Sequence, residues 1–115
     1  MSSREINLYL EDMIDASVDI LDFTREAHTA EDLTNDRRTY LAVVRCLEIL
    51  GEAARQVPQG FKDKHSEIPW REISSLRNII AHEYFGLDQE ILWDVVQTQI
   101  PDLLIQIRRI RSGED

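Results

Sequence analysis

Apolar residues recur along this chain at steps of three and four residues, and this periodicity most constrains its fold. No stretch alternates apolar and polar residues for long enough to predict a strand. Ser2 and Glu5 have the Ser-x-x-Glu spacing of a capping box, so we expect a first helix to begin there and to end near residues 25–28. Its expected buried face consists of Ile6, Leu10, Met13, Ser17, Ile20 and Phe23.

Two further helices follow from the same pattern. Residues 29–36 are rich in capping residues and predict a turn and the start of the second helix, which Pro58 and Gly60 end. Pro69 suits the first position of a third helix, which we expect to run towards Tyr84. The apolar face of the second helix consists of Tyr40, Val43, Val44, Leu47, Leu50, Gly51 and Ala54.

The last apolar series begins after Asp88, a good N-cap, and continues to Ile110. Pro101 lies in its middle, so we expect a kink or two shorter helices there. Together the segments predict an all-α, up-and-down bundle of four to five helices. The length of 115 residues fits one domain covering 1–115.

The composition narrows the classes of function. Thirteen basic and twenty-two acidic residues give a formal charge of −9, so a nucleic-acid function needs a local basic site that overrides the acidic surface. A single cysteine, Cys46, excludes an internal disulfide and favours a reducing cytoplasm. No apolar run reaches the roughly 20 residues that cross a bilayer, and the N-terminus has no apolar signal core, so we expect no membrane association.

An acidic stripe is expected on the first helix, formed by Asp12, Asp15, Asp19 and Asp22. We interpret it as a solvated face, with arginines of a neighbouring helix as candidate partners, in preference to a docking surface for a basic partner. Carboxylates spread over about 15 Å of helix do not converge on one ion, so no metal site is expected.

The stretch from Arg77 to Tyr84 gathers groups that hold phosphate and move protons. On a helix, Arg77 and Tyr84 share one face and Asn78 and His82 another, but Arg77 and His82 lie about 140° apart. Three arrangements bring them together: the helix unwinds around His82, Arg77 reaches around, or a second copy completes the site. The alternative is a surface charge and a structural histidine with no catalytic role.

Three blocks of sequence resemble one family. They are Leu47-Glu48-Ile49-Leu50-Gly51-Glu52-Ala53-Ala54, then Ile68-Pro69-Trp70, then Arg77-Asn78-Ile79-Ile80-Ala81-His82-Glu83-Tyr84-Phe85-Gly86. The last contains the Arg-x4-His-x-Tyr signature of HEPN-domain ribonucleases, and the chain as a whole resembles the HepT family of toxins.

The resemblance implies a helical homodimer in which the two signatures face a cleft. It implies a metal-independent endoribonuclease, neutralised by an MntA-type nucleotidyltransferase antitoxin that attaches AMP to the residue corresponding to Tyr84. ATP is then the substrate of that partner, and this chain needs no cofactor.

The residues suit this chemistry. Metal-free RNA cleavage needs a base for the ribose 2′-hydroxyl, a role for His82, and a cation for the phosphate, a role for Arg77. Asn78 can orient His82 or donate to the phosphate, and an AMP group on Tyr84 would block the site. The expected products are a 2′,3′-cyclic phosphate and a 5′-hydroxyl.

Arg45 and Glu52 of the second helix are candidates to line the cleft, with packing or ion pairing as the alternative. The rival to a ribonuclease is a non-catalytic helical partner of a minimal nucleotidyltransferase, which the acidic charge mildly favours. A metal-dependent enzyme that uses the acidic stripe is a weaker reading, because the spacing of the carboxylates argues against it. A purely structural helical dimer is the remaining alternative.

Overall fold

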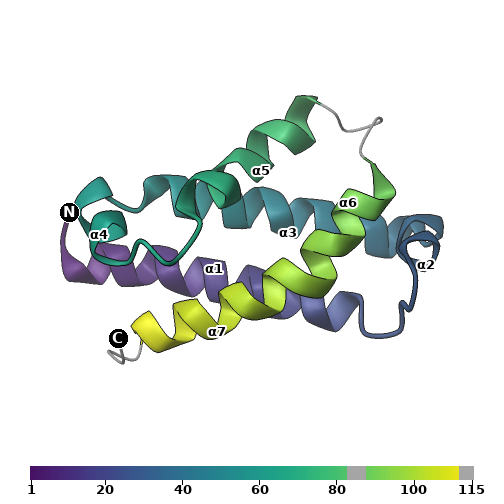
Figure 1. The fold of residues 1–115 in the computed structure, drawn as a ribbon, viewed down its shortest axis with the longest axis horizontal. Helices are drawn as coiled ribbons and strands as arrows, with labels where there is room; N and C mark the ends of the chain where they lie inside the picture. Colours follow the sequence, from purple (N-terminus) through teal and green to yellow (C-terminus); the bar gives the residue numbers. More distant parts are fainter. Residues whose placement is uncertain (83–87, 112–115) are drawn as a thin grey trace.

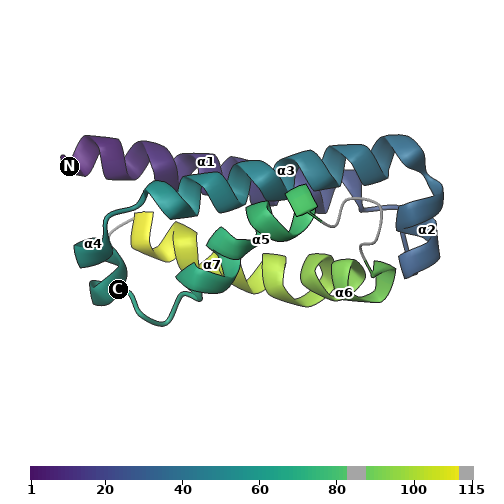
Figure 2. The same cartoon turned by 90° about the horizontal axis from the view of Figure 1, so that it is seen from above.

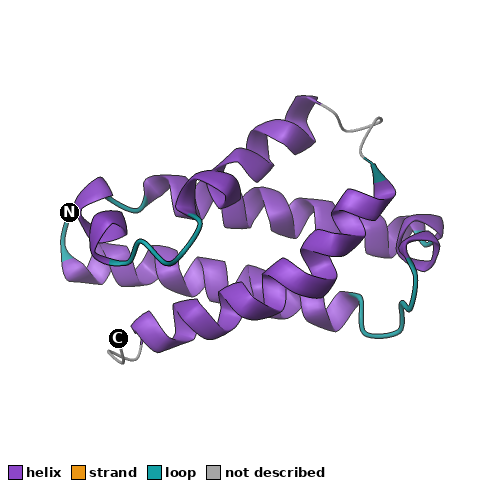
Figure 3. Ribbon diagram, viewed as in Figure 1, coloured by secondary structure: helices purple, strands orange, loops and turns teal. Residues whose placement is uncertain are grey.

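The computed structural model describes residues 1–82 and 88–111, and within 77–82 it describes the backbone alone. The described residues form helices and contain no strand, which confirms the predicted all-α class (Figure 3). The helices are α1 (Ser3–Phe23), α2 (Ala30–Asn35), α3 (Arg37–Gln56), α4 (Gln59–Lys64), α5 (Trp70–His82), α6 (Gln89–Asp94), a π-helical turn η1 (Val95–Gln99) and α7 (Ile100–Arg111).

The long helices form two layers. Helices α1 and α3 lie side by side, while α5 and the continuous rod of α6, η1 and α7 cover one face of that pair (Figures 1 and 2). Helix α5 packs on α3, and α7 packs on α1. Four long helical segments therefore make up the bundle, as the periodicity predicted, and α2 and α4 are short helices within its connections.

The core is a single apolar cluster to which both layers contribute. Leu10 and Ile20 of α1 and Leu50 of α3 are at most 1% exposed, and Ile100 and Ile107 of the second layer are equally buried. Of the face expected for the first helix, Leu10, Met13, Ser17 and Ile20 are buried and Ile6 is partly buried. The exception is Phe23, which is 44% exposed because α1 ends there.

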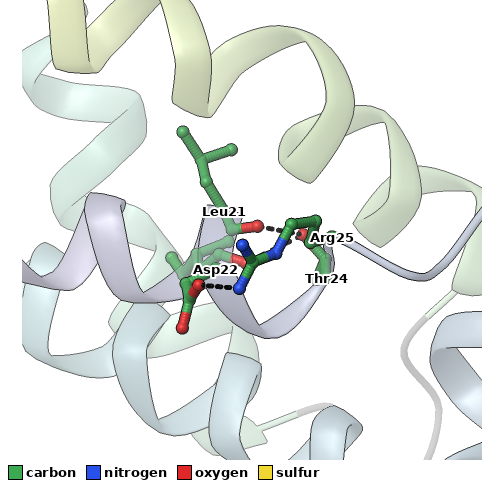
Figure 4. Close-up of polar contacts among 5 residues, drawn as sticks. Leu21, Asp22, Thr24 and Arg25 are labelled. Carbon is green, nitrogen blue, oxygen red and sulfur yellow. Dashed lines mark hydrogen bonds and ion pairs between the residues drawn. The ribbon is translucent and has the colours of Figure 1, made fainter.

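Side chains cap both ends of α1. The Ser2 hydroxyl accepts a hydrogen bond from the Glu5 backbone N–H at 3.2 Å, which confirms Ser2 as the N-cap and the predicted start of the helix. At the other end, the buried Thr24 hydroxyl donates to the Ile20 carbonyl at 2.8 Å. The same hydroxyl lies 3.5 Å from the Leu21 carbonyl (Figure 4). Arg25, just past the helix, pairs with Asp22 at 2.6 Å. The Ser2 bond satisfies a backbone N–H group that the start of the helix leaves open.

Pro101 does not break the last helix. The expected interruption takes the form of the π-helical turn η1, in which the Ile100 N–H donates to the Val95 carbonyl five residues earlier. Pro101 lacks an N–H and cannot donate to the preceding turn, and a wider turn at this point lets the helix continue past it.

Candidate functional site

Helix α5 carries the signature and is anchored by its first turns. Ile68, Trp70 and Ile73 are each at most 7% exposed, and the Trp70 indole N–H donates to the His65 carbonyl at 3.0 Å. The helix begins at Trp70, one residue later than predicted, and Pro69 directly precedes it: the Ile73 N–H donates to the Pro69 carbonyl as the first helical hydrogen bond. The start of α5 is therefore fixed against the core, and the signature lies towards its other end.

The signature positions Arg77, Asn78 and His82 all lie in α5, whose last residue is His82. Because the backbone stays helical to His82, the Cα atoms of Arg77 and His82 lie about 140° apart around the axis. The backbone is helical up to His82, its last described residue before 88, so unwinding around His82, the reach of Arg77 and a second copy all stay as possible arrangements. Tyr84 and the side chains of 77–82 lie outside the described residues.

An apolar groove of about 230 Å³ lies beside α5, between it and the last helix. Leu50 of α3, Ile73 and Leu76 of α5, and Val95 and Leu103 contribute to its lining. Leu76 directly precedes Arg77, so the groove runs to the edge of the signature.

Arg45 and Glu52 line a second depression, a groove of about 390 Å³ that also includes Tyr9 and Asp12 of α1; we call it the α1–α3 groove. Arg45 lies 3.7 Å from Glu48, and the Glu52 carboxylate accepts hydrogen bonds from Arg55 at 2.8 and 3.2 Å. The structure thus brings Arg45 and Glu52 together on one surface. It also places both in ion pairs on their own helix, as the alternative interpretation expected.

The remaining lining of the α1–α3 groove could not be foreseen. Tyr9 and Asp12 lie on a different helix from Arg45, and no local pattern joins the two segments. Asp12 is exposed, but partial loss of water at its carboxyl raises the pKa, and the neighbouring charges of Asp15 and Glu11 raise it further. The groove is therefore crowded with negative charge, although Arg45 lies in it.

The acidic stripe of α1 is solvated, as interpreted from the sequence. Asp12, Asp15, Asp19 and Asp22 are all exposed. The partner of Asp22 is Arg25, three residues on, and not an arginine of a neighbouring helix. Among residues 1–76 and 88–111, no three or more His, Cys, Asp or Glu side chains converge as a metal site would require. Burial raises the pKa of the Cys46 thiol, which disfavours its reactive thiolate form.

Comparison with known proteins places these features in a family. The sequence profile described as "Ribonuclease HepT-like" matches residues 13–110, a range that contains the whole signature. The chain belongs to the HepT-like ribonuclease family. No solved structure matches the chain significantly.

Relatives in the HepT-like family cover nearly the whole chain. A protein of Thermococcus cleftensis named "Probable ribonuclease HepT" is 45% identical over 104 residues, covering 90% of this chain and 94% of its own. A protein of Methanocaldococcus jannaschii, named as a candidate RNase, is 35% identical over 118 aligned positions, covering 100% and 97%. A candidate RNase of Caldanaerobacter subterraneus is 42% identical over 84 residues, which cover 73% of this chain and 75% of the relative.

In the described part of this chain, no helix combines the length and apolar character needed to cross a bilayer.

Proposed function

We propose that this chain is the toxin of a toxin–antitoxin pair, a metal-independent endoribonuclease that acts in the cytoplasm. The observation that carries the proposal is the family match over residues 13–110, with relatives named as ribonucleases, together with the signature at the end of α5. The substrate class is RNA, and the chain needs no cofactor of its own.

His82 and Arg77 are the proposed catalytic pair. His82 takes the proton from the ribose 2′-hydroxyl, whose oxygen attacks the adjacent phosphorus. The bond from phosphorus to the 5′-oxygen breaks, and that oxygen leaves with a proton as a 5′-hydroxyl. Arg77 holds the phosphate oxygens while negative charge builds on them, and Asn78 orients His82 or donates to the same oxygens. The other product is a 2′,3′-cyclic phosphate.

A homodimer is proposed because one straight helix does not direct Arg77 and His82 to one point. Two copies that pair through the signature ends of α5 place Arg77 of one protomer near His82 of the other. The apolar groove that runs to the edge of the signature supplies a surface for this pairing. Arg45 and Glu52 are proposed as supporting residues on the wall of the cleft, where they pair with Glu48 and Arg55.

Regulation is proposed through Tyr84, two residues beyond His82. An MntA-type nucleotidyltransferase antitoxin transfers AMP from ATP to the tyrosine hydroxyl and releases pyrophosphate. The attached AMP adds bulk and negative charge beside the phosphate site and so excludes RNA. Protein purified with its partner should be heavier than unmodified protein by one or more AMP units, and Tyr84→Phe should remove that added mass.

The direct test is RNA cleavage in EDTA by the purified dimer. His82→Ala and Arg77→Ala should each lower the cleavage rate by at least about 100-fold, because each removes a group that acts in the transition state. His28→Ala and Arg71→Ala are matched controls, since both side chains are exposed and lie outside the signature. Cleavage that persists in both signature variants would contradict the assignment. Absence of cleavage with tight nucleotidyltransferase binding would favour the non-catalytic partner.

A mixing experiment tests the composite site. Arg77→Ala and His82→Ala proteins, each inactive, are mixed so that protomers exchange. If each site takes Arg77 from one protomer and His82 from the other, mixed dimers hold one intact site, and about a quarter of the activity should return. If protomer exchange is verified by mass but no activity returns, both residues of a site come from one protomer.

A further inference from the structure

A hollow at the end of the bundle combines a cation, an aromatic ring and an amide. It lies where α2, the start of α3 and the start of α6 meet, and encloses about 500 Å³. Its lining consists of Thr34, Arg37, Tyr40 and Gln89; we call it the α2–α6 hollow. In both views the start of α6 lies next to α2 (Figures 1 and 2).

The α2–α6 hollow differs from four other hollows of the described surface because its lining contains no carboxylate. The α1–α3 groove contains three, the apolar groove beside α5 contains one, and two further hollows contain three each. In a chain with a formal charge of −9, a carboxylate-free surface with an arginine suits an anion better than these four do. The carboxylates are Asp12, Glu48 and Glu52 in the α1–α3 groove and Asp102 in the apolar groove beside α5. In the two further hollows they are Glu26, Asp32 and Asp36, and Asp63, Glu67 and Glu72.

Arg37 is available to a ligand. It is exposed, is the first residue of α3, and makes no ion pair with the described residues. Four other arginines are already engaged in ion pairs: Arg25 with Asp22, Arg45 with Glu48, Arg55 with Glu52, and Arg111 with Glu11. Arg38, next in the chain, acts on Asp36, whose pKa is lowered chiefly by the Thr39 N–H and also by the nearby charge of Arg38.

The side chains around Arg37 suit a nucleotide. Tyr40 is partly buried against the core, and its ring lines the hollow, as a platform for a base would. The Thr34 hydroxyl donates to the Gln89 side-chain carbonyl at 3.0 Å and fixes that amide between α2 and α6. The Gln89 amide nitrogen then provides donors, and the Arg37 guanidinium provides the planar fork that fits a phosphate.

The position of the hollow relates it to the signature. Gln89 begins α6 and lies seven residues beyond His82. A chain of that length spans at most about 25 Å, so the hollow is within reach of a short RNA strand that enters the catalytic site.

We propose that the α2–α6 hollow is an RNA-binding subsite that holds a nucleotide flanking the cleaved bond, with Arg37 on its phosphate and Tyr40 against its base. The proposal rests on the proposed ribonuclease function and adds the element that an acidic chain needs, a local site for the RNA backbone. It concerns binding and positioning of RNA and assigns no catalytic step to these residues.

The binding test uses the His82→Ala protein and a fluorescein-labelled single-stranded RNA, followed by anisotropy across a salt series. Arg37→Ala added to this background should weaken binding about tenfold, because a charge-assisted hydrogen bond is lost. The slope of log K against log salt should fall by about 0.7. Arg38→Ala is the matched control, because it removes the same charge at the adjacent exposed position.

A kinetic test separates the two proposals. In the otherwise unsubstituted protein, Arg37→Ala should raise KM for RNA about tenfold and leave kcat within about twofold, since the residue acts in binding. If cleavage depends on His82 but Arg37→Ala and Arg38→Ala bind RNA with equal affinity, the proposed subsite is wrong. The proposed ribonuclease function then still stands. If no cleavage depends on His82, the proposed ribonuclease function is wrong. If the protein does not bind RNA at all, both the ribonuclease function and the subsite are wrong.

Discussion

The α1–α3 groove and the α2–α6 hollow each contain an arginine and a tyrosine, yet their electrostatics are opposite. In the groove, Arg45 shares the surface with Asp12, Glu48 and Glu52, and its guanidinium lies 3.7 Å from Glu48. In the hollow, Arg37 has no carboxylate in the lining around it. In an acidic protein, the neighbours of an arginine decide whether it is free to hold a phosphate, and its presence alone does not.

The pKa shifts follow the same division. In the groove, partial loss of water and the charges of Asp15 and Glu11 raise the pKa of Asp12. At the start of α3, the N–H of Thr39 lowers the pKa of Asp36, because the carboxylate caps the helix. In the groove, the carboxylates repel one another. Beside the hollow, the Asp36 carboxylate is stabilised by a hydrogen bond from a backbone N–H group.

The largest expected difference between the two surfaces concerns their tyrosines. Tyr40→Leu should weaken RNA binding at least about fivefold, because the stacking platform is lost, whereas Tyr40→Phe should bind as the unsubstituted protein does. Tyr9→Leu in the groove is the matched control and should change affinity by less than about twofold, since no base stacks there. Anisotropy on the His82→Ala background measures all three. Equal losses for Tyr40→Leu and Tyr9→Leu would erase the distinction between the surfaces.

A smaller effect is expected when the groove is made to resemble the hollow. Glu48→Gln removes the ion-pair partner of Arg45 and should strengthen RNA binding about two- to threefold, since an exposed pair of this kind is weak. Glu26→Gln removes the same charge elsewhere on the surface and serves as the control. An identical gain in both variants would mean that net charge alone, and not the release of Arg45, controls the affinity.

The smallest expected effect concerns stability and pH. The folded-state pKa of Asp12 is raised, so its ionised form opposes folding at neutral pH, and that cost disappears as pH falls below the unfolded value near 3.8. Asp12→Asn removes its repulsion with Asp15, three residues on, and should raise stability at pH 7 by about 0.3 kcal/mol. That gain corresponds to a Tm increase of about 1–2 °C.

The pKa shift of Asp36 has the opposite sign to that of Asp12, and so does its effect on the pH dependence of stability. Its folded-state pKa is lowered, so its contribution to stability is present above the unfolded value near 3.8 and is lost as pH falls through the folded value. Asp36→Ala should therefore destabilise the protein at pH 7 and make little difference at low pH. Thermal melts of both variants between pH 2 and pH 7 measure the two profiles. A gain from Asp12→Asn that persists at the lowest pH would contradict the electrostatic cause.

Local signals in the sequence predicted the helices well. The Ser2 N-cap of α1 is confirmed and α5 starts within one residue of the predicted Pro69, because caps and first turns depend on residues within about four positions. Phe23 fits the same periodicity but is exposed, since burial requires that a second element cover the position and α1 ends there. The wider turn at η1 follows from Pro101, although the pattern predicted only an interruption.

The candidate site, too, has a part that the sequence predicted and a part that it did not. The signature from Arg77 to Tyr84 could be found in the sequence, because all its members lie in one short stretch. Its catalytic role and the pairing of two copies remain proposals, tested by the variants of His82 and Arg77. The α2–α6 hollow had no sequence signal, since Thr34 and Gln89 are 55 positions apart.

The sequence by itself determined the helical class, the boundaries set by caps and prolines, and the family, because these depend on local spacing and on ordered blocks of residues. Only the tertiary structure decided which side chains of other helices surround each arginine. Arg37 and Arg45 are both exposed residues of α3, and the sequence itself offers Arg45 a local partner in Glu48, three residues on. The packing of the helices adds Asp12 of α1 to the groove that holds Arg45 and Gln89 of α6, an uncharged amide, to the hollow that holds Arg37, because side chains far apart in the sequence meet only when their helices pack together.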